Sequence, residues 1–282
     1  GALKKALKAK PAPFMDKRFA GRVRTGNFDD HMSRITDCDW VVEVVTEDAA
    51  IKQSLYEKVL PHLGENAIFT SNTSGIPLST LTAGFPEDVK KRFFVTHFFN
   101  PPRYMRLLEV IQGPETDPAL VDVVRQFASR NLGKGVVDAK DTVNFIANRI
   151  GIHGMMLTLH KAIELGYGVR EVDAITGPAM GRPSSATFKT ADLVGVDTLA
   201  HVAKNCYDNL PNDEERDIFQ LPSAVTQMLE KGYAGRKAGA GFYKKEGKTL
   251  LTLNLETLEF ENIDKPRIDS LGVAKKTDDV VR

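Results

Sequence analysis

The chain has 282 residues, of which 42% are hydrophobic and 27% charged, a composition typical of a globular protein rather than a disordered one. At roughly 150 residues per domain, the length predicts about two domains. With a formal net charge of +1, the chain lacks the excess of positive charge that is typical of nucleic-acid-binding proteins. Two cysteines exclude a disulfide-rich secreted scaffold and favour a cytoplasmic protein, and no apolar run is long enough for a membrane span.

The first 24 residues are strongly basic. They carry eight basic side chains and one acidic one, a local charge of +7. Apolar residues at helical spacing predict a short amphipathic helix that ends before Pro11. Such a helix is more often a solvated surface element. The alternative is that Lys4, Lys5 and Lys8 bind a phosphate-rich ligand.

The segment from residue 40 to residue 141 alternates between apolar runs and helical spacing. The valine-rich run WVVEVVT (40–46) is typical of a strand buried on both faces. The helix after it is marked by Ile51, Leu55 and Val59. We expect strands at 40–46, 67–74, 93–99, 107–113 and 133–141, with helices at 48–60, from residue 78 and at 118–132. This alternation predicts a parallel α/β sheet with right-handed crossovers.

After Asp141 the pattern becomes helical. We expect helices at 144–166, 170–176, 187–194, 198–209 and 222–231. A hairpin should begin near residue 239, and the polar residues 261–282 should form a linker. The predicted domains are therefore an α/β domain at 1–140, an all-helical domain at 141–243, and a hairpin with a linker tail at 244–282.

An α/β half followed by a helical half suggests a nucleotide-binding dehydrogenase, in which a glycine-rich phosphate loop follows the first strand. The sequence has no such loop, because the nearest match, Gly239–Gly241, is not followed by a helical pattern. A sheet that begins at residue 40 also lacks the first two strands of this fold. The chain starts with Gly1 rather than Met, and residues 1–10 lack the apolar core of a signal peptide. We therefore expect a chain that enters a dinucleotide-binding domain partway through.

Four motifs carry a resemblance to a known family. They are SNTSGIP (71–77), HFFNPP (97–102), an acid at Glu109 twelve positions after His97, and DTVNFIANRIG (141–151). Together they resemble the 3-hydroxyacyl-CoA dehydrogenase family of fatty-acid β-oxidation, over about residues 25–243. The resemblance implies an incomplete Rossmann-like domain followed by a helical domain that forms a homodimer. It also implies oxidation of a (3S)-3-hydroxyacyl-CoA to a 3-ketoacyl-CoA with NAD as cofactor.

The tail after Tyr243 resembles the linker of bacterial multifunctional β-oxidation proteins, which implies a covalently linked enoyl-CoA hydratase region. NAD rather than NADP is implied by the family alone. Because the glycine loop that binds the pyrophosphate is absent from the sequence, we expect the chain alone to bind NAD poorly and to be inactive.

His97 and Glu109 are the central candidates. From the residues alone, His97 could be a core histidine at a strand end and Glu109 a solvent-facing acid on an edge strand. Ligands of open α/β sheets bind at the carboxyl ends of strands, however, and a side chain with an ordinary pKa near 6.5 suits a general base. The resemblance implies that His97 takes the hydroxyl proton and that Glu109 orients its ring.

The remaining candidates depend more on the resemblance. It implies that Ser74 and Asn148 bind the substrate oxygens, and that the acyl-CoA substrate lies against residues 181–199. Cofactor contacts are implied for Glu47, Lys52, Asn72, Asn100 and Lys237. By themselves, Ser74 could be a helix cap, Asn100 a turn residue, and Glu47 with Lys52 an exposed pair on a helix. We expect no metal site.

The sequence departs from the family at one point. Where the family usually has Asp-Thr-Pro-Gly-Phe, this chain has Asp-Thr-Val-Asn-Phe at 141–145, which should alter the hinge between the domains. Three other functions stay open: a different β-hydroxyacid dehydrogenase, a non-catalytic acyl-CoA-binding or dimerisation module, and a structural, crystallin-like relative. The first relies on a lysine base, and the His97 and Glu109 pair argues against it.

Overall fold

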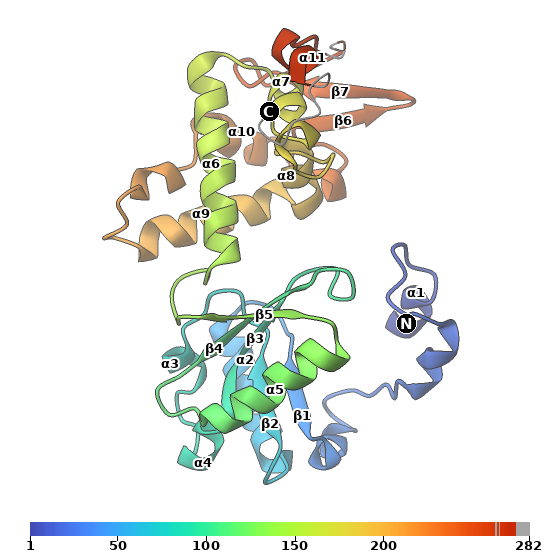
Figure 1. Cartoon of the computed structure of the whole chain (residues 1–282), viewed down its shortest axis with the longest axis vertical. Coiled ribbons are helices and arrows are strands. Elements are labelled where there is room, and N and C mark those ends of the chain that lie inside the picture. The colour runs from blue at the N-terminus through green and yellow to red at the C-terminus, as the bar shows by residue number, and fades with distance from the viewer. Residues whose placement is uncertain (263, 265, 275–282) are drawn as a thin grey trace. The chain divides into compact units, whose positions relative to one another are not determined.

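The computed structural model of the protein describes residues 1–262, 264 and 266–274 (Figure 1). The chain divides into two compact units, Gly1–Ile146 and Ala147–Arg282, here called the N-terminal unit and the helical unit. Within the described residues, no helix is long and apolar enough to cross a membrane. The predicted linker lies partly outside the described residues, at 263, 265 and 275–282, and a short helix, α11 (Asp269–Ala274), forms within it.

The N-terminal unit is built on a five-stranded sheet with the order β1-β2-β3-β4-β5. Its strands are β1 (Trp40–Glu43), β2 (Ile68–Ser71), β3 (Phe93–Phe98), β4 (Leu107–Gln112) and β5 (Gly135–Ala139). The pairs β1·β2, β2·β3 and β4·β5 are parallel, which confirms the predicted parallel α/β sheet. The pair β3·β4 is antiparallel. The connection at 99–106 is too short for a crossover helix, so β4 has to run back along β3.

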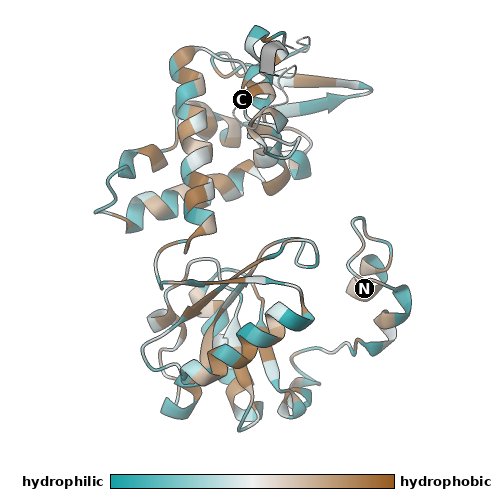
Figure 2. Ribbon diagram, viewed as in Figure 1, coloured by the Kyte–Doolittle hydropathy of each residue, from teal (hydrophilic) through white to brown (hydrophobic). Residues whose placement is uncertain are grey.

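Helices cover both faces of this sheet. They are α2 (Ala49–Val59), α3 (Leu78–Leu81), α4 (Glu87–Lys90) and α5 (Pro118–Asn131). Leu55 and Tyr56 of α2 pack with Phe93 on one face, and Val124 of α5 packs with Phe94 on the other. Figure 2 shows hydrophobic residues along the strands, and it shows both hydrophobic and hydrophilic residues on α5. β2 is fully buried, whereas β1, at the sheet edge, is shorter and more exposed than predicted.

The segment before β1 contains α1 (Ala2–Ala6) and two 3-10 helices, Lys17–Arg22 and Met32–Asp37. Helix α1 has no buried residue, as expected for a short basic helix in solvent. The loop after β3 contacts this segment, because Tyr104 donates its hydroxyl hydrogen to the carbonyl oxygen of Ala12 at 2.9 Å.

The helical unit contains α6 (Ala147–Leu165), α7 (Val169–Ile175), α8 (Phe188–Val194), α9 (Val196–Asn209) and α10 (Ser223–Glu230). A small antiparallel sheet follows, made of β6 (Tyr243–Glu246), β7 (Thr249–Leu253) and β8 (Phe260–Glu261). One core joins α6 to the hairpin through Met156, Phe188, Phe242 and Leu253. The predicted hairpin therefore packs as part of this unit rather than as a separate tail.

Two buried carboxylates tie the hairpin to the helices. Asp192 in α8 accepts the backbone N–H groups of Phe242 and Tyr243, each at 2.8 Å. Asp173 in α7 accepts the N–H of Phe188 at 2.7 Å and the hydroxyl of Tyr243 at 2.9 Å. Burial raises the pKa of Asp192 to about 6 and also raises that of Asp173, although the hydrogen bonds oppose the change.

We expect the wild-type helical unit to lose stability relative to Asp192→Asn as the pH rises from about 4 to about 6. In this window the unfolded chain has released the Asp192 proton while the folded protein still binds it, so unfolding becomes more favourable with rising pH. The loss should be about 3 kcal/mol and constant above about pH 7. Urea unfolding followed by circular dichroism measures it, and a flat difference between the two proteins would contradict the prediction.

Candidate active site

His97 and Glu109 face each other on neighbouring strands. The antiparallel register of β3 and β4 places the two residues opposite each other. The Nδ1 atom of His97 lies 2.7 Å from Oε2 of Glu109, and both side chains are buried. The Oε1 atom of Glu109 accepts the backbone N–H of Ile146 at 3.2 Å. Since a carboxylate can only accept, the ring proton belongs on Nδ1, which leaves Nε2 able to take a proton.

Two phenylalanines enclose the histidine ring. The ring centroid of Phe99 lies 4.5 Å from that of His97, and the centroid of Phe145 lies at 5.5 Å. Phe145 follows Asn144, and both have positive φ angles, 49° and 58°. The usual family glycine would occupy position 144, and Asn is the residue that tolerates this left-handed conformation best after Gly. Asn144 thus adopts the left-handed conformation just before Phe145, whose ring contacts that of His97.

The loop that follows β2 lies beside the end of β3. Asn72 accepts the backbone N–H of Phe98, the neighbour of His97, through its Oδ1 atom at 2.9 Å. Ser74 is half-buried, and its backbone N–H donates to Oε1 of Glu47 at 2.7 Å. The structure therefore brings Asn72, Ser74 and Glu47 together near the strand that carries His97.

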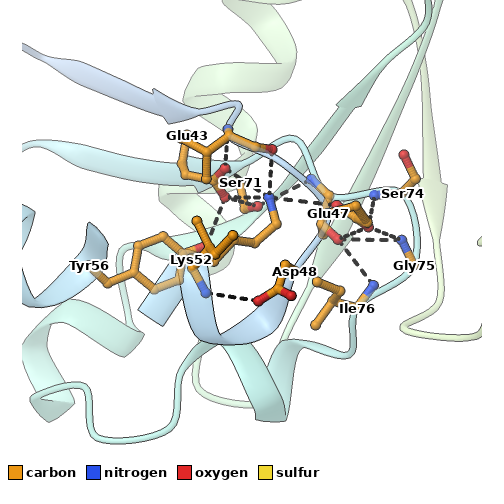
Figure 3. A network of polar contacts seen from close by, with 12 residues as sticks. Glu43, Glu47, Asp48, Lys52, Tyr56, Ser71, Ser74, Gly75 and Ile76 are labelled. Carbon is orange, nitrogen blue, oxygen red and sulfur yellow. Dashed lines mark hydrogen bonds and ion pairs between the residues drawn. The ribbon is translucent and has the colours of Figure 1, made fainter. Parts of the chain in front are cut away.

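Lys52 and Glu47 make contacts that their sequence pattern did not indicate (Figure 3). Lys52 is only 1% exposed, so it does not belong to an exposed pair on a helix. Its Nζ atom lies 2.8 Å from Oε1 of Glu43 and 3.6 Å from Oε2 of Glu47. Glu43 was not among the predicted site residues, although an acid inside a run of valines is a visible signal, because a carboxylate buried there needs a partner.

Asn100 lies exposed in the loop between β3 and β4. Lys134, which stands just before β5, holds this loop, because its Nζ atom donates to the carbonyl oxygens of Pro102 and, at 2.7 Å, Met105. Burial lowers the pKa of Lys134. Nothing in the sequence pattern around Lys134 predicted this contact.

The other predicted site residues lie elsewhere in the chain. Asn148 stands in the first turn of α6 and is half-buried, and Lys237 forms an exposed ion pair with Asp197 at 2.7 Å, both in the helical unit. Lys4, Lys5 and Lys8 are exposed in and after α1. Their contacts with cofactor or substrate stay predictions.

Polar side chains gather where β1, β2 and β3 end, which is the edge of an open α/β sheet at which ligands bind. A cavity of about 1010 Å³ also opens along β1, lined by Val42 and Val44 together with Arg24, Phe28 and Arg34. Between residue 1 and residue 262, no glycine-rich turn joins a strand to a helix to hold a pyrophosphate. The described side chains also form no cluster of His, Cys, Asp and Glu that could hold a metal ion.

The chain is similar to known proteins over most of its length. Residues 2–142 match the NAD-binding domain of 3-hydroxyacyl-CoA dehydrogenase, and residues 145–245 match its C-terminal domain. The chain is 47% identical over 275 residues to a probable 3-hydroxyacyl-CoA dehydrogenase of Bacillus subtilis, covering 98% of this chain and 35% of that protein. It is 45% identical to one of Deinococcus radiodurans, covering 86% of this chain and 69% of that protein.

A putative fatty acid oxidation complex trifunctional enzyme of Rickettsia felis is 36% identical over 92% of this chain and 36% of that protein. The chain thus spans about a third of the Bacillus and Rickettsia relatives. The crystal structure of Mycobacterium tuberculosis FadB2 superposes with a TM-score of 0.74 at 28% identity, covering 87% of this chain and 83% of that one. The family resemblance of the sequence motifs is confirmed: the chain belongs to the 3-hydroxyacyl-CoA dehydrogenase family and matches both its NAD-binding and its C-terminal domain.

Proposed function

We propose that the protein oxidises a (3S)-3-hydroxyacyl-CoA to a 3-ketoacyl-CoA in fatty-acid oxidation, with NAD as the hydride acceptor. The observation that carries the proposal is the buried pair of His97 and Glu109 at the end of the sheet where ligands of this fold class bind. Family membership supports the same reaction.

In this reaction the hydroxyl of the substrate donates its proton to Nε2 of His97. Bound NAD would supply the acceptor for the hydride on the carbon that carries this hydroxyl, and loss of the proton and the hydride would convert the alcohol to a ketone. The histidine ring becomes an imidazolium, and Glu109 at 2.7 Å balances its charge. Because the pair is buried, this charge interaction is stronger than it would be in water.

The other groups complete the proposed site. Ser74 and Asn148 hold the substrate oxygens, and Lys4, Lys5 and Lys8 meet the phosphates of CoA. The cofactor contacts are Asn72 and Asn100 together with Glu47, Lys52 and Lys237. The helical domain forms a homodimer, supported by exposed apolar side chains on α6 such as Ile150 and Leu165. A covalently linked enoyl-CoA hydratase region fits the trifunctional relative.

The test is the rate of NADH consumption with acetoacetyl-CoA, followed by absorbance at 340 nm, for the protein expressed from its complete reading frame. We expect substrate-dependent consumption of NADH. A non-catalytic module or a structural relative would give none, and a different hydroxyacid dehydrogenase would act on a free acid but not on the CoA thioester. Residues 1–282 expressed alone should bind NADH weakly, since the described residues lack a glycine-rich phosphate loop. Tight binding of NADH to this chain would contradict that last expectation.

A further inference from the structure

Glu43 is the centre of a buried polar cluster at the end of β1. Its carboxylate accepts four donors: the N–H of Val45 at 2.6 Å, Nζ of Lys52 at 2.8 Å, the hydroxyl of Tyr56 at 2.8 Å and that of Ser71 at 2.6 Å (Figure 3). Four of these five residues are at most 4% exposed. Burial raises the pKa of Tyr56, so its hydroxyl keeps the proton that it donates.

Stability alone does not account for such a cluster. A buried ion pair loses the hydration of two charges, and apolar side chains of the same volume would often give an equally stable fold. The four donors instead fix the position of the Glu43 carboxylate, because each of its two oxygens accepts hydrogen bonds from two directions.

The first connection leads to the loop that carries Ser74. Ser71 accepts the backbone N–H of Thr73 at 3.2 Å, and Thr73 donates its hydroxyl hydrogen to Glu47 at 2.6 Å. The same oxygen of Glu47 accepts the N–H groups of Ser74 at 2.7 Å and Gly75 at 3.1 Å. Every residue from 71 to 75 except Asn72 is thus joined by side-chain hydrogen bonds to the carboxylate of Glu43 or of Glu47.

The second connection leads to the strand that carries His97. The backbone N–H of Asn72 donates to the carbonyl oxygen of Glu43 at 2.8 Å. The side chain of Asn72 then accepts the N–H of Phe98 at 2.9 Å. The residues at the ends of β1 and β2 therefore fix the positions of both the loop that carries Ser74 and the end of β3.

We propose that Glu43 is a positioning residue, which acts through Ser71 to hold Ser74 in place relative to His97. The proposal rests on the function proposed above. Glu43 touches neither substrate nor cofactor, and its effect on the reaction is the placement of other groups. A misplacement of about 1 Å at a reacting centre can lower a rate by about 100-fold.

In the protein expressed from its complete reading frame, two variants test this role as a matched pair. Ser71→Ala and Tyr56→Phe each remove one hydroxyl donor from the same oxygen of Glu43, and both leave the ion pair with Lys52 in place. The serine joins Glu43 to the loop, whereas the tyrosine joins it to α2. We expect Ser71→Ala to lower kcat by about 10- to 100-fold with a much smaller change in KM for acetoacetyl-CoA, and Tyr56→Phe to leave kcat within about 3-fold of wild type.

Hydrogen exchange of the backbone amides supplies a readout that does not need activity. Exchange at residues 73–75 should be faster in Ser71→Ala than in Tyr56→Phe. Equal effects of the two variants on kcat and on exchange in this loop would overturn the proposal, because a merely structural cluster would respond to either loss. If the protein expressed from its complete reading frame has no dehydrogenase activity, the proposed function fails, and the exchange measurement still decides whether Ser71, which joins Glu43 to Thr73, holds the loop in place.

Discussion

In the protein expressed from its complete reading frame, His97→Gln should lower the kcat for the proposed oxidation of 3-hydroxyacyl-CoA by about 10²- to 10⁴-fold and leave the Kd for NADH almost unchanged. Glutamine fills a similar volume but cannot accept a proton from the substrate hydroxyl at neutral pH. The loss should therefore appear in the chemical step rather than in cofactor binding. Steady-state kinetics and calorimetric titration with NADH measure the two quantities, and near-normal turnover would remove His97 from the mechanism.

Glu109→Gln is the matched control for this pair. An amide can present an N–H to Nδ1 of His97, which would favour the tautomer with the proton on Nε2, the atom that has to accept one. This variant should therefore also lower kcat, although the histidine is still present. A Glu109→Gln protein as active as wild type would show that the carboxylate has no part in orienting the ring.

Lys52→Met should destabilise the N-terminal unit by about 3–5 kcal/mol, because it leaves the carboxylate of Glu43 buried without its cation. Trp40 is the only tryptophan of the chain and packs against Phe98 and Phe127, so its fluorescence reports on this unit. At an m-value of about 1–3 kcal/mol per M, the urea midpoint should fall by more than about 1 M.

The double variant Glu43→Gln with Lys52→Met separates charge from packing. It removes both charges, so it should recover part of the stability that Lys52→Met loses. If Lys52→Met alone changes the unfolding free energy by less than about 1 kcal/mol, Lys52 is not an essential partner of a buried carboxylate.

The sequence allowed the family, the α/β and helical halves and the His97 and Glu109 pair to be predicted, because motifs and apolar periodicity are local properties. The burial of Lys52 could not be predicted in the same way. The spacing of Ile51, Leu55 and Val59 suggested the inner face of α2, yet Ile51 is 50% exposed and Lys52 lies inside. Periodicity counts lysine as polar, so a buried lysine shifts the apparent face of the helix.

Tertiary context also decided the environment of Glu109. From the sequence it could face solvent on an edge strand or meet His97. The structure puts β4 between β3 and β5, so Glu109 is buried and the antiparallel register places it opposite His97. Neither strand order nor register follows from periodicity alone, since both depend on how the connecting loop folds.

The antiparallel pairing of β3 and β4 restricts which insertions and deletions would keep His97 and Glu109 in contact. Side chains alternate between the two faces of a strand, so one residue inserted between Leu107 and Glu109 would turn the carboxylate to the opposite face from His97. A two-residue insertion would restore the face but move the carboxylate by about 7 Å along the strand. In related genomes, insertions and deletions should therefore gather in the 99–106 loop and spare the strand from Leu107 to Glu109.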